Sequence, residues 1–126
     1  MSDRKIISTP AAPTPAGAYS QGVQVGNILF TAGFGPQDAA NGNAIPDTVG
    51  EQTRQVMRNV QATLQAAGFA LSDVVKTTVH LADLSDWAEF DAAYGEFFPT
   101  NPPARTTVGS VLSNILVEID VVAIKG

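Results

Sequence analysis

The chain has no cysteine and only one histidine. Without cysteine, disulfide bonds and thiolate metal sites are excluded, so the fold depends on its hydrophobic core. The lone histidine, His80, has no second histidine or carboxylate at metal-ligand spacing. We therefore interpret it as a packed or surface residue and expect no metal.

Long apolar runs are also missing. No segment approaches the ~20 apolar residues of a membrane-spanning helix, and no signal-peptide core follows the N-terminus. We therefore expect a cytoplasmic protein. With 126 residues and 44% hydrophobic content, the chain is expected to form a single domain over residues 1–126.

Basic residues are few. Seven lysines and arginines stand against twelve aspartates and glutamates, a formal net charge of −5, and no basic cluster exists. Nucleic acids and anionic membranes are therefore disfavoured as partners. Phosphate-binding glycine loops and Gly-x-Ser-x-Gly nucleophile motifs are absent as well. A single arginine can still capture a small anion, so small acids remain as candidate ligands.

The hydrophobic pattern predicts an α+β domain with two helices and a mixed sheet. Thr48 and Glu51 form a capping box for the first helix, Gly68 suits its left-handed end, and Asp86 is expected to cap the second. A proline-rich segment, residues 9–17, is expected to be an ordered loop or an extended arm. Helices are expected at residues 48–68 and 86–98, and strands at 6–7, 23–25, 28–31, 74–81, 104–108 and 115–124.

Each element has an expected buried side. In the first helix the glutamine and arginine face, including Gln55, is predicted to be solvated, whereas Trp87 and Phe97 of the second helix are predicted to point inward. In the fourth strand Val75, Thr77, Val79 and Leu81 are placed on one face. The last strand is apolar on both faces, which two helices on one side cannot cover, so we expect a homo-oligomer.

Arg105 is the residue most suggestive of function, because its guanidinium stays charged and fits a carboxylate with two donors. It shares a strand face with Thr107, as Glu118 does with Asp120. Two readings remain open from residue types alone. Arg105 either forms a structural ion pair with Glu118, Asp120 or Glu96, or binds a small acid. Tyr19 is likewise either a packed anchor of the arm or part of a site.

Several motifs make the chain resemble the RidA (YjgF) family over nearly its whole length. They are Gly17-Ala18-Tyr19-Ser20-Gln21-Gly22, Phe30-Thr31-Ala32-Gly33, Val75-Lys76-Thr77-Thr78-Val79, Pro103-Ala104-Arg105 and Val117-Glu118-Ile119-Asp120. The resemblance implies a chorismate-mutase-like fold, with a mixed sheet covered by two helices on one face. It also implies a homotrimer with clefts between subunits. This agrees with the uncovered sheet face.

The resemblance further implies hydrolytic deamination of reactive 2-imino or enamine acids to 2-keto acids and ammonia, without a cofactor. Arg105 would hold the substrate carboxylate, Asp120 would orient water, and Tyr19 would close the cleft. Backbone groups near Gly33 and Thr107 would donate hydrogen bonds.

Four of the implied substrate-binding positions depart from the usual pattern of this family. Ala32 lacks a hydroxyl, so a donor there must be the backbone, and Phe34 replaces a more usual polar residue, which suggests a bulkier or more apolar substrate. The other two are Thr107 in place of cysteine and Asp91 in place of asparagine. In addition, Asp120 stands where glutamate is usual, so its carboxylate reaches roughly 1.5 Å less far.

The alternatives are a non-catalytic, carboxylate-binding or regulatory trimer and, less favoured by the charge, an endoribonuclease or translation inhibitor. The hydrolase hypothesis expects Arg105 to be unpaired at a seam between identical chains and to face Asp120 across a cleft.

Overall fold

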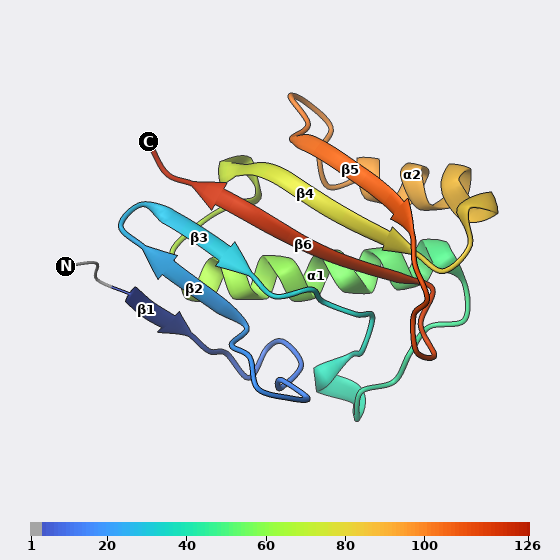
Figure 1. The fold of residues 1–126 in the computed structure, drawn as a ribbon, viewed down its shortest axis with the longest axis horizontal. Coiled ribbons are helices and arrows are strands. Elements are labelled where there is room, and N and C mark those ends of the chain that lie inside the picture. Colours follow the sequence, from blue (N-terminus) through green and yellow to red (C-terminus); the bar gives the residue numbers. More distant parts are fainter. Residues whose placement is uncertain (1–3) are drawn as a thin grey trace.

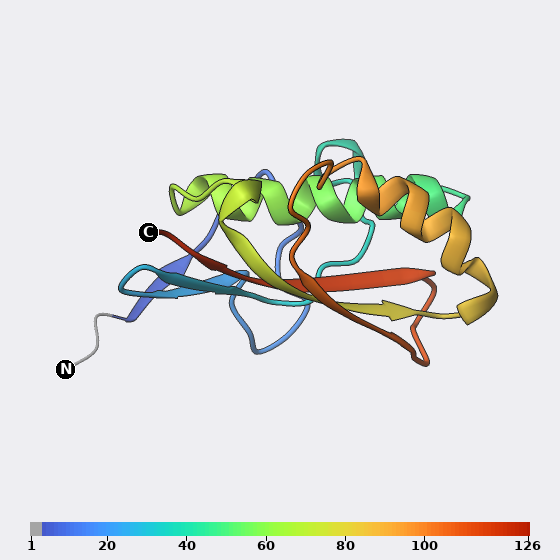
Figure 2. The same ribbon diagram turned by 90° about the horizontal axis from the view of Figure 1, so that it is seen from above.

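A six-stranded mixed sheet with both helices on one face makes up the computed structural model, which describes residues 4–126 (Figures 1 and 2). The strand order is β1-β2-β3-β6-β4-β5, and only the β4–β5 pair is parallel. The predicted α+β architecture is therefore confirmed. Its elements are β1 (Arg4–Ile7), β2 (Gly22–Val25), β3 (Ile28–Thr31), α1 (Val49–Ala66), β4 (Val74–Leu81), α2 (Trp87–Gly95), β5 (Ala104–Gly109) and β6 (Val117–Ile124).

Helix α1 begins where the capping signal predicts. The Thr48 hydroxyl accepts a hydrogen bond from the backbone N–H of Glu51 at 3.1 Å, and Gly68 follows the helix with φ +80°. One prediction for this helix is wrong. Gln55 is buried rather than solvated, because its amide donates to Asn59 Oδ1 on the next turn. The apolar stripe on the core comprises Val49, Val56, Met57, Val60 and Leu64.

Helix α2 starts differently from the prediction. Asp86 makes no capping hydrogen bond; instead Asp83 Oδ1 accepts from the N–H of Ser85 and opens a 3₁₀ turn, Leu84–Asp86, that leads into α2. Trp87, expected to point inward, is 43% exposed in the first turn of the helix. The helix ends at Gly95, and the irregular chain beyond it buries Phe98 rather than Phe97.

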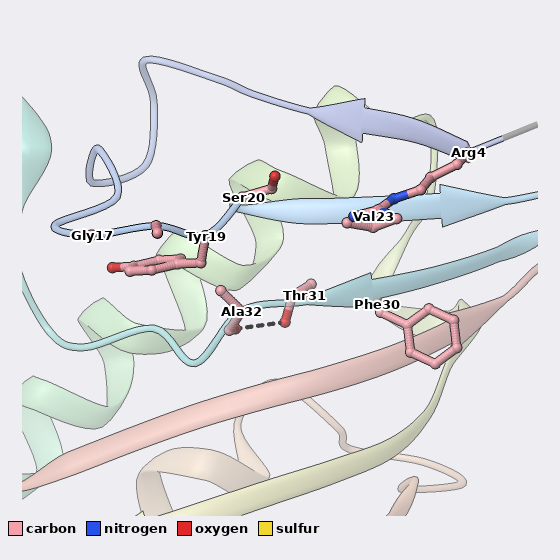
Figure 3. Close-up of a pocket in the computed structure, with 9 residues that line it drawn as sticks. Arg4, Gly17, Tyr19, Ser20, Val23, Phe30, Thr31 and Ala32 are labelled. Atoms are coloured by element: carbon pink, nitrogen blue, oxygen red, sulfur yellow. Dashed lines mark hydrogen bonds between the residues drawn. The ribbon is translucent and has the colours of Figure 1, made fainter.

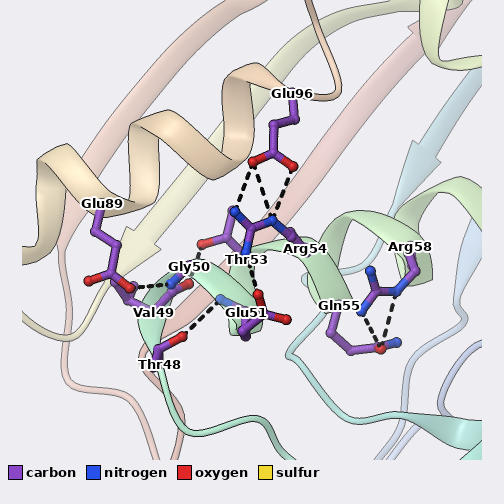
Figure 4. A network of polar contacts seen from close by, with 10 residues as sticks. All are labelled: Thr48, Val49, Gly50, Glu51, Thr53, Arg54, Gln55, Arg58, Glu89 and Glu96. Carbon is purple, nitrogen blue, oxygen red and sulfur yellow. Dashed lines mark hydrogen bonds and ion pairs between the residues drawn. The ribbon is translucent and has the colours of Figure 1, made fainter.

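Ion pairs on the outer surface join the two helices (Figure 4). Arg54 of α1 donates to Glu96 through Nε at 3.0 Å and Nη2 at 2.8 Å, and it also pairs with Glu51. Glu89 of α2 accepts from the N–H of Gly50, at the start of α1, at 2.9 Å. Glu96 is therefore occupied and is not the partner of Arg105.

A register shift displaces the start of β4. Between Val74 and Lys76 the pairing with β6 slips, which turns Val74 into the core and leaves Val75 45% exposed. The prediction that placed Val75 on the same face as Thr77, Val79 and Leu81 is wrong for this reason. From Thr77 onward the strand alternates regularly, and Thr77 faces the helices.

The two faces of the sheet differ in how they are covered. On β6, Ile119 and its alternate neighbours are buried beneath the helices, whereas Glu118 and Asp120 belong to the open face, the side of the sheet away from the helices. Phe30 and Ile124 of the open face are 48% and 40% exposed. Within residues 4–126 no helix has both the length and the apolarity to cross a bilayer.

Candidate functional site

Most of the expected site residues lie in two groups on opposite faces of the sheet. The first group, named here the open-face cleft, surrounds a hollow of about 380 Å³ lined by Tyr19, Ala32, Gly33 and Glu118. A second hollow, of about 660 Å³, adjoins it along β2 and β3 and shares Tyr19 and Ala32 (Figure 3). The second group, the arginine site, contains Arg105, Asp91 and Thr107 beside α2.

Tyr19 forms one wall of the open-face cleft. Its hydroxyl accepts a hydrogen bond from the backbone N–H of Ala16 at 3.1 Å, and its ring is 52% exposed. Figure 3 shows the ring extended beside Ala32. The ring is therefore not packed into the core of its own chain, and it is available to a ligand or to a neighbouring molecule.

Gln21 fixes the proline-rich arm that carries Tyr19. Its buried side chain accepts from the N–H of Thr9 at 2.7 Å and donates to the carbonyls of Thr9, Ala12 and Pro13 at 2.8–3.2 Å. One amide thus satisfies four backbone groups that no regular strand pairs. The arm is an ordered loop, which is one of the two forms that the sequence left open.

Asn59 fixes the opposite wall. From its buried place in α1 it donates to the carbonyls of Gly35 and Gln37 at 3.0 and 2.9 Å. The chain that follows Gly33 is therefore held against α1. Phe34 in this segment is 5% exposed and packs in the core, and it also lines a hollow of about 240 Å³ together with Tyr19 and Gly33.

The backbone of Ala32 is not free, contrary to expectation. Its N–H donates to the carbonyl of Gln21 at 2.9 Å, and its carbonyl accepts from the Thr31 hydroxyl at 2.9 Å (Figure 3). Among residues 4–126, the next N–H, that of Gly33, has no protein acceptor within hydrogen-bond range. Gly33 is the available backbone donor in the cleft.

Glu118, rather than Asp120, is the acid that faces the open-face cleft. A Cβ atom added to Gly33 would lie 2.7 Å from Glu118 Oε2, which places the carboxylate directly over the glycine backbone. Over the described part of the chain this carboxylate has no hydrogen bond or ion pair. Sequence reasoning considered Glu118 only as an ion-pair partner of Arg105, although it placed this residue on the same face as Asp120.

Asp120 lies one position further along the open face, opposite Thr78 of β4. Partial burial raises the pKa of its carboxyl group, and the charges of His80 and Lys76 on β4 act in the opposite direction. None of the hollows around Tyr19 is lined by Asp120. The shorter reach of the Asp120 carboxylate therefore does not affect how water is oriented in the open-face cleft.

Arg105 is held in the arginine site by aromatic rings of α2. Its guanidinium carbon lies 4.8 Å from the ring centre of Tyr94, 5.2 Å from that of Phe90 and 5.4 Å from that of Trp87. Such cation–π contacts hold the cation in a partly desolvated position. Sequence reasoning missed Trp87 as a site residue because helical spacing assigned it to the core.

Arg105 is paired with an acid, whereas the hydrolase hypothesis expected it to be unpaired. Its Nη1 donates to Asp91 Oδ1 at 2.7 Å, an acid that was considered only as a substrate contact. Within residues 4–126 its Nε and Nη2 have no acceptor on the protein. One edge of the guanidinium is therefore occupied and the other remains open to an anion.

Arg105 and Asp120 do not face one another within the chain. Arg105 pairs in register with Thr77, which points toward α2, whereas Asp120 pairs with Thr78, which points the other way. Thr107 shares the face of Arg105, and its buried hydroxyl lacks a hydrogen-bond partner in the described structure. No group of three or more histidine, cysteine or acidic side chains among residues 4–126 could hold a metal ion.

Known proteins resemble the chain along almost its whole length. The family model described as Endoribonuclease L-PSP matches residues 9–125. A RutC family protein of Pyrococcus horikoshii is 41% identical over 97% of this chain and 98% of its own length. Rat 2-iminobutanoate/2-iminopropanoate deaminase is 38% identical over 98% of this chain and 91% of the rat protein. The crystal structure of Escherichia coli TdcF with bound serine superposes with a TM-score of 0.92 at 35% identity, covering 97% of this chain and 99% of TdcF.

Proposed function

We propose, because the chain belongs to the Endoribonuclease L-PSP family, that it hydrolyses small 2-imino or enamine acids to 2-keto acids and ammonia. This family is the RidA/YjgF family, and it includes proteins that are named as imine deaminases. The observation that carries the proposal is the unpaired Glu118 carboxylate over Gly33, beside Tyr19. A carboxylate in a hollow with a free backbone donor suits proton transfer to and from a bound ligand.

Arg105 would bind the substrate carboxylate through its open edge, since Nε and Nη2 have the spacing for a two-donor contact. The rings of Phe90 and Tyr94 keep the guanidinium from moving during binding. The serine bound to the related TdcF supports a ligand that carries a carboxylate.

Glu118 would perform the proton transfers. Its carboxylate accepts a proton from a water molecule as the water oxygen bonds to the carbon of the protonated imine and the C=N double bond becomes single. The carboxyl group then returns that proton to the nitrogen. As the C–N bond breaks and ammonia leaves, the carboxylate takes up the proton of the hydroxyl group that becomes the keto oxygen. The N–H of Gly33 is placed to orient the reacting group, because it lies under the same carboxylate.

These two groups must come from different copies of the chain, because Glu118 belongs to the open face and Arg105 contacts α2 on the other side. A self-associated protein in which the open face of one copy meets β5 and α2 of the next would complete the site. The expected homotrimer, with its clefts between subunits, would provide such a contact. The exposed apolar side chains of the open face, among them Phe30 and Ile124, support such an association.

We do not propose ribonuclease activity, although the family description contains that word. The formal net charge is −5, and the open-face cleft is itself acidic through Glu118. RNA binding relies on phosphate contacts to basic residues, which this surface does not supply in number.

The test generates 2-iminopropanoate in situ with an amino-acid oxidase and traps the surviving imine as its semicarbazone. The protein is expected to lower semicarbazone yield and raise the rate of keto acid formation. Arg105→Ala and Glu118→Gln should each reduce the acceleration by a factor on the order of 100.

Two matched variants serve as controls. Arg58→Ala removes an arginine of α1 that, within residues 4–126, donates hydrogen bonds to Gln55 alone, and Asp120→Asn removes the neighbouring acid. Both should retain activity. Wild-type protein that leaves the semicarbazone yield unchanged would refute the proposed hydrolysis, and loss of activity in Asp120→Asn but not Glu118→Gln would return the acid role to Asp120.

A further inference from the structure

The ion pair between Arg105 and Asp91 places opposite charges side by side in the arginine site. Asp91 Oδ1 accepts from Arg105 Nη1 at 2.7 Å. The Asp91 side chain is 53% exposed, whereas that of Arg105 is only 20% exposed. A ligand that approaches the open edge of Arg105 therefore also meets an exposed carboxylate.

Arg105 is not free to leave Asp91 and meet an anion elsewhere. Its guanidinium lies within 5.4 Å of three aromatic ring centres, and those rings belong to α2, the helix that also carries Asp91. One rigid element thus fixes both charges relative to one another. A ligand carboxylate bound to Arg105 therefore lies within the negative electrostatic field of Asp91.

We propose that Asp91 is a specificity-determining residue that makes the site prefer ligands with a cationic nitrogen next to the carboxylate over plain keto acids. The ligand class is an iminium or ammonium carboxylate. This inference rests on the proposed function, since it assigns the carboxylate to Arg105. The Asp91 carboxylate repels the carboxylate of a keto acid bound at Arg105. A cationic nitrogen next to the ligand carboxylate offsets this repulsion.

The preference has a chemical consequence. Protonated imine carries its positive charge on the nitrogen and loses it when ammonia departs. The keto acid product then retains only the anionic group, next to Asp91. The acid therefore favours binding of the substrate and release of the product.

A purely structural role of Asp91 can be distinguished from a role of its charge by substitution with asparagine. In the described part of the chain, Asp91 bonds only to Arg105, so its side chain could serve simply to anchor the arginine. Asparagine has the same shape and can still accept from Nη1 through its carbonyl oxygen. Asp91→Asn therefore keeps the anchor and removes the charge.

The experiment compares L-alanine and pyruvate, which share one carbon skeleton, by titration calorimetry at pH 7. Wild-type protein should bind alanine more tightly than pyruvate. In Asp91→Asn the ratio of the two affinities should fall about tenfold, with pyruvate gaining and alanine losing affinity. An unchanged ratio, or an equal change for both ligands, overturns the proposal.

Glu51→Gln is the matched control, because it neutralises another exposed carboxylate that pairs with an arginine, Arg54, away from the site. It should leave both affinities unchanged. Thermal melting of each variant confirms folding, and Arg105→Ala should abolish binding of both ligands. Retained binding in that variant overturns the assignment.

The semicarbazone assay on the same preparations separates the two proposals. If the wild-type protein hydrolyses the imine but Asp91→Asn has the same ratio of alanine and pyruvate affinities as wild type, the role of Asp91 is rejected and the proposed reaction is retained. A tenfold change in ratio without hydrolysis supports the role of Asp91 and rejects the reaction. Failure of wild-type protein to bind either ligand rejects the role of Asp91.

Discussion

The carboxylate of Glu118 lies so close to Gly33 that a single added methyl group would fall 2.7 Å from Oε2. Real Cβ atoms do not approach a neighbour so closely, so a larger residue at position 33 must move the acid. The backbone at this glycine does not have a positive φ. The requirement for glycine here is thus one of space beside the carboxylate.

Gly33→Ala should therefore lower kcat/KM for imine hydrolysis about tenfold to a hundredfold while changing the melting temperature little. Gly95→Ala is the matched control, because a Cβ at that position meets nothing within 4 Å. Steady-state kinetics and thermal melting of both variants check the expectation. Unchanged kinetics in Gly33→Ala would show that the position of Glu118 does not matter.

Asp120 should make stability depend on pH. Because burial raises its pKa above the ordinary value of 3.8, folding favours the protonated form and the ionised form destabilises the native state. The favourable contribution is complete below pH 3.8 and is lost as the pH rises through the folded-state pKa. His80, Lys76 and Glu118 are the charged or titratable neighbours on the open face.

Asp120→Asn should accordingly melt at a higher temperature than wild type at pH 7, with the difference shrinking as the pH falls toward 4. Melting curves at equal protein concentration across this range provide the measurement. A difference that stays constant over the whole range would contradict the assignment.

Tyr94 links α2 to the sheet beneath Arg105. Its hydroxyl lies 2.8 Å from that of Thr77, and both side chains are buried. Tyr94→Phe should cost about 1–2 kcal/mol of unfolding free energy, because the Thr77 hydroxyl would be left without a partner. The further change Thr77→Val should recover part of this loss in denaturant titrations. Additive losses in the double variant would argue against a direct hydrogen bond.

Self-association should depend on the open face. Phe30→Glu places a charge among its exposed apolar side chains, and we expect the variant to sediment as a smaller species than wild type. Val111→Glu introduces the same charge at a fully exposed loop position and should leave the assembly intact. If Phe30→Glu sediments as wild type does, the open face is not the contact surface.

Local sequence signals predicted most of the fold but not the relations between distant strands. The cap at Thr48 and the alternation of β6 depend on neighbours in the chain, and both were read correctly. Arg105 and Asp120 were expected to face each other. The face on which each of these side chains lies depends on how β5 and β6 pair with β4. Alternation within a single strand does not reveal this pairing.

Two other features that local patterns do not reveal have similar causes. Phe34 bridges to Ile119 and so turns into the core, which depends on a strand more than 80 residues away. The exposed side of Val75 follows from a register shift that no single strand encodes. Glu118 was recoverable, since the alternation that described its strand already placed it beside Asp120.

Placement of the open-face cleft and Arg105 on opposite sides of the sheet has a genetic consequence. Arg105→Ala and Glu118→Gln would each disable one half of a composite site, so co-expression of the two inactive alleles should restore a fraction of wild-type turnover. Mixed assemblies would contain some seams that carry both defects and some that carry neither. The proposed composite site also predicts that turnover per chain falls on dilution, before any unfolding, because each separate copy carries only half of the residues assigned to the reaction.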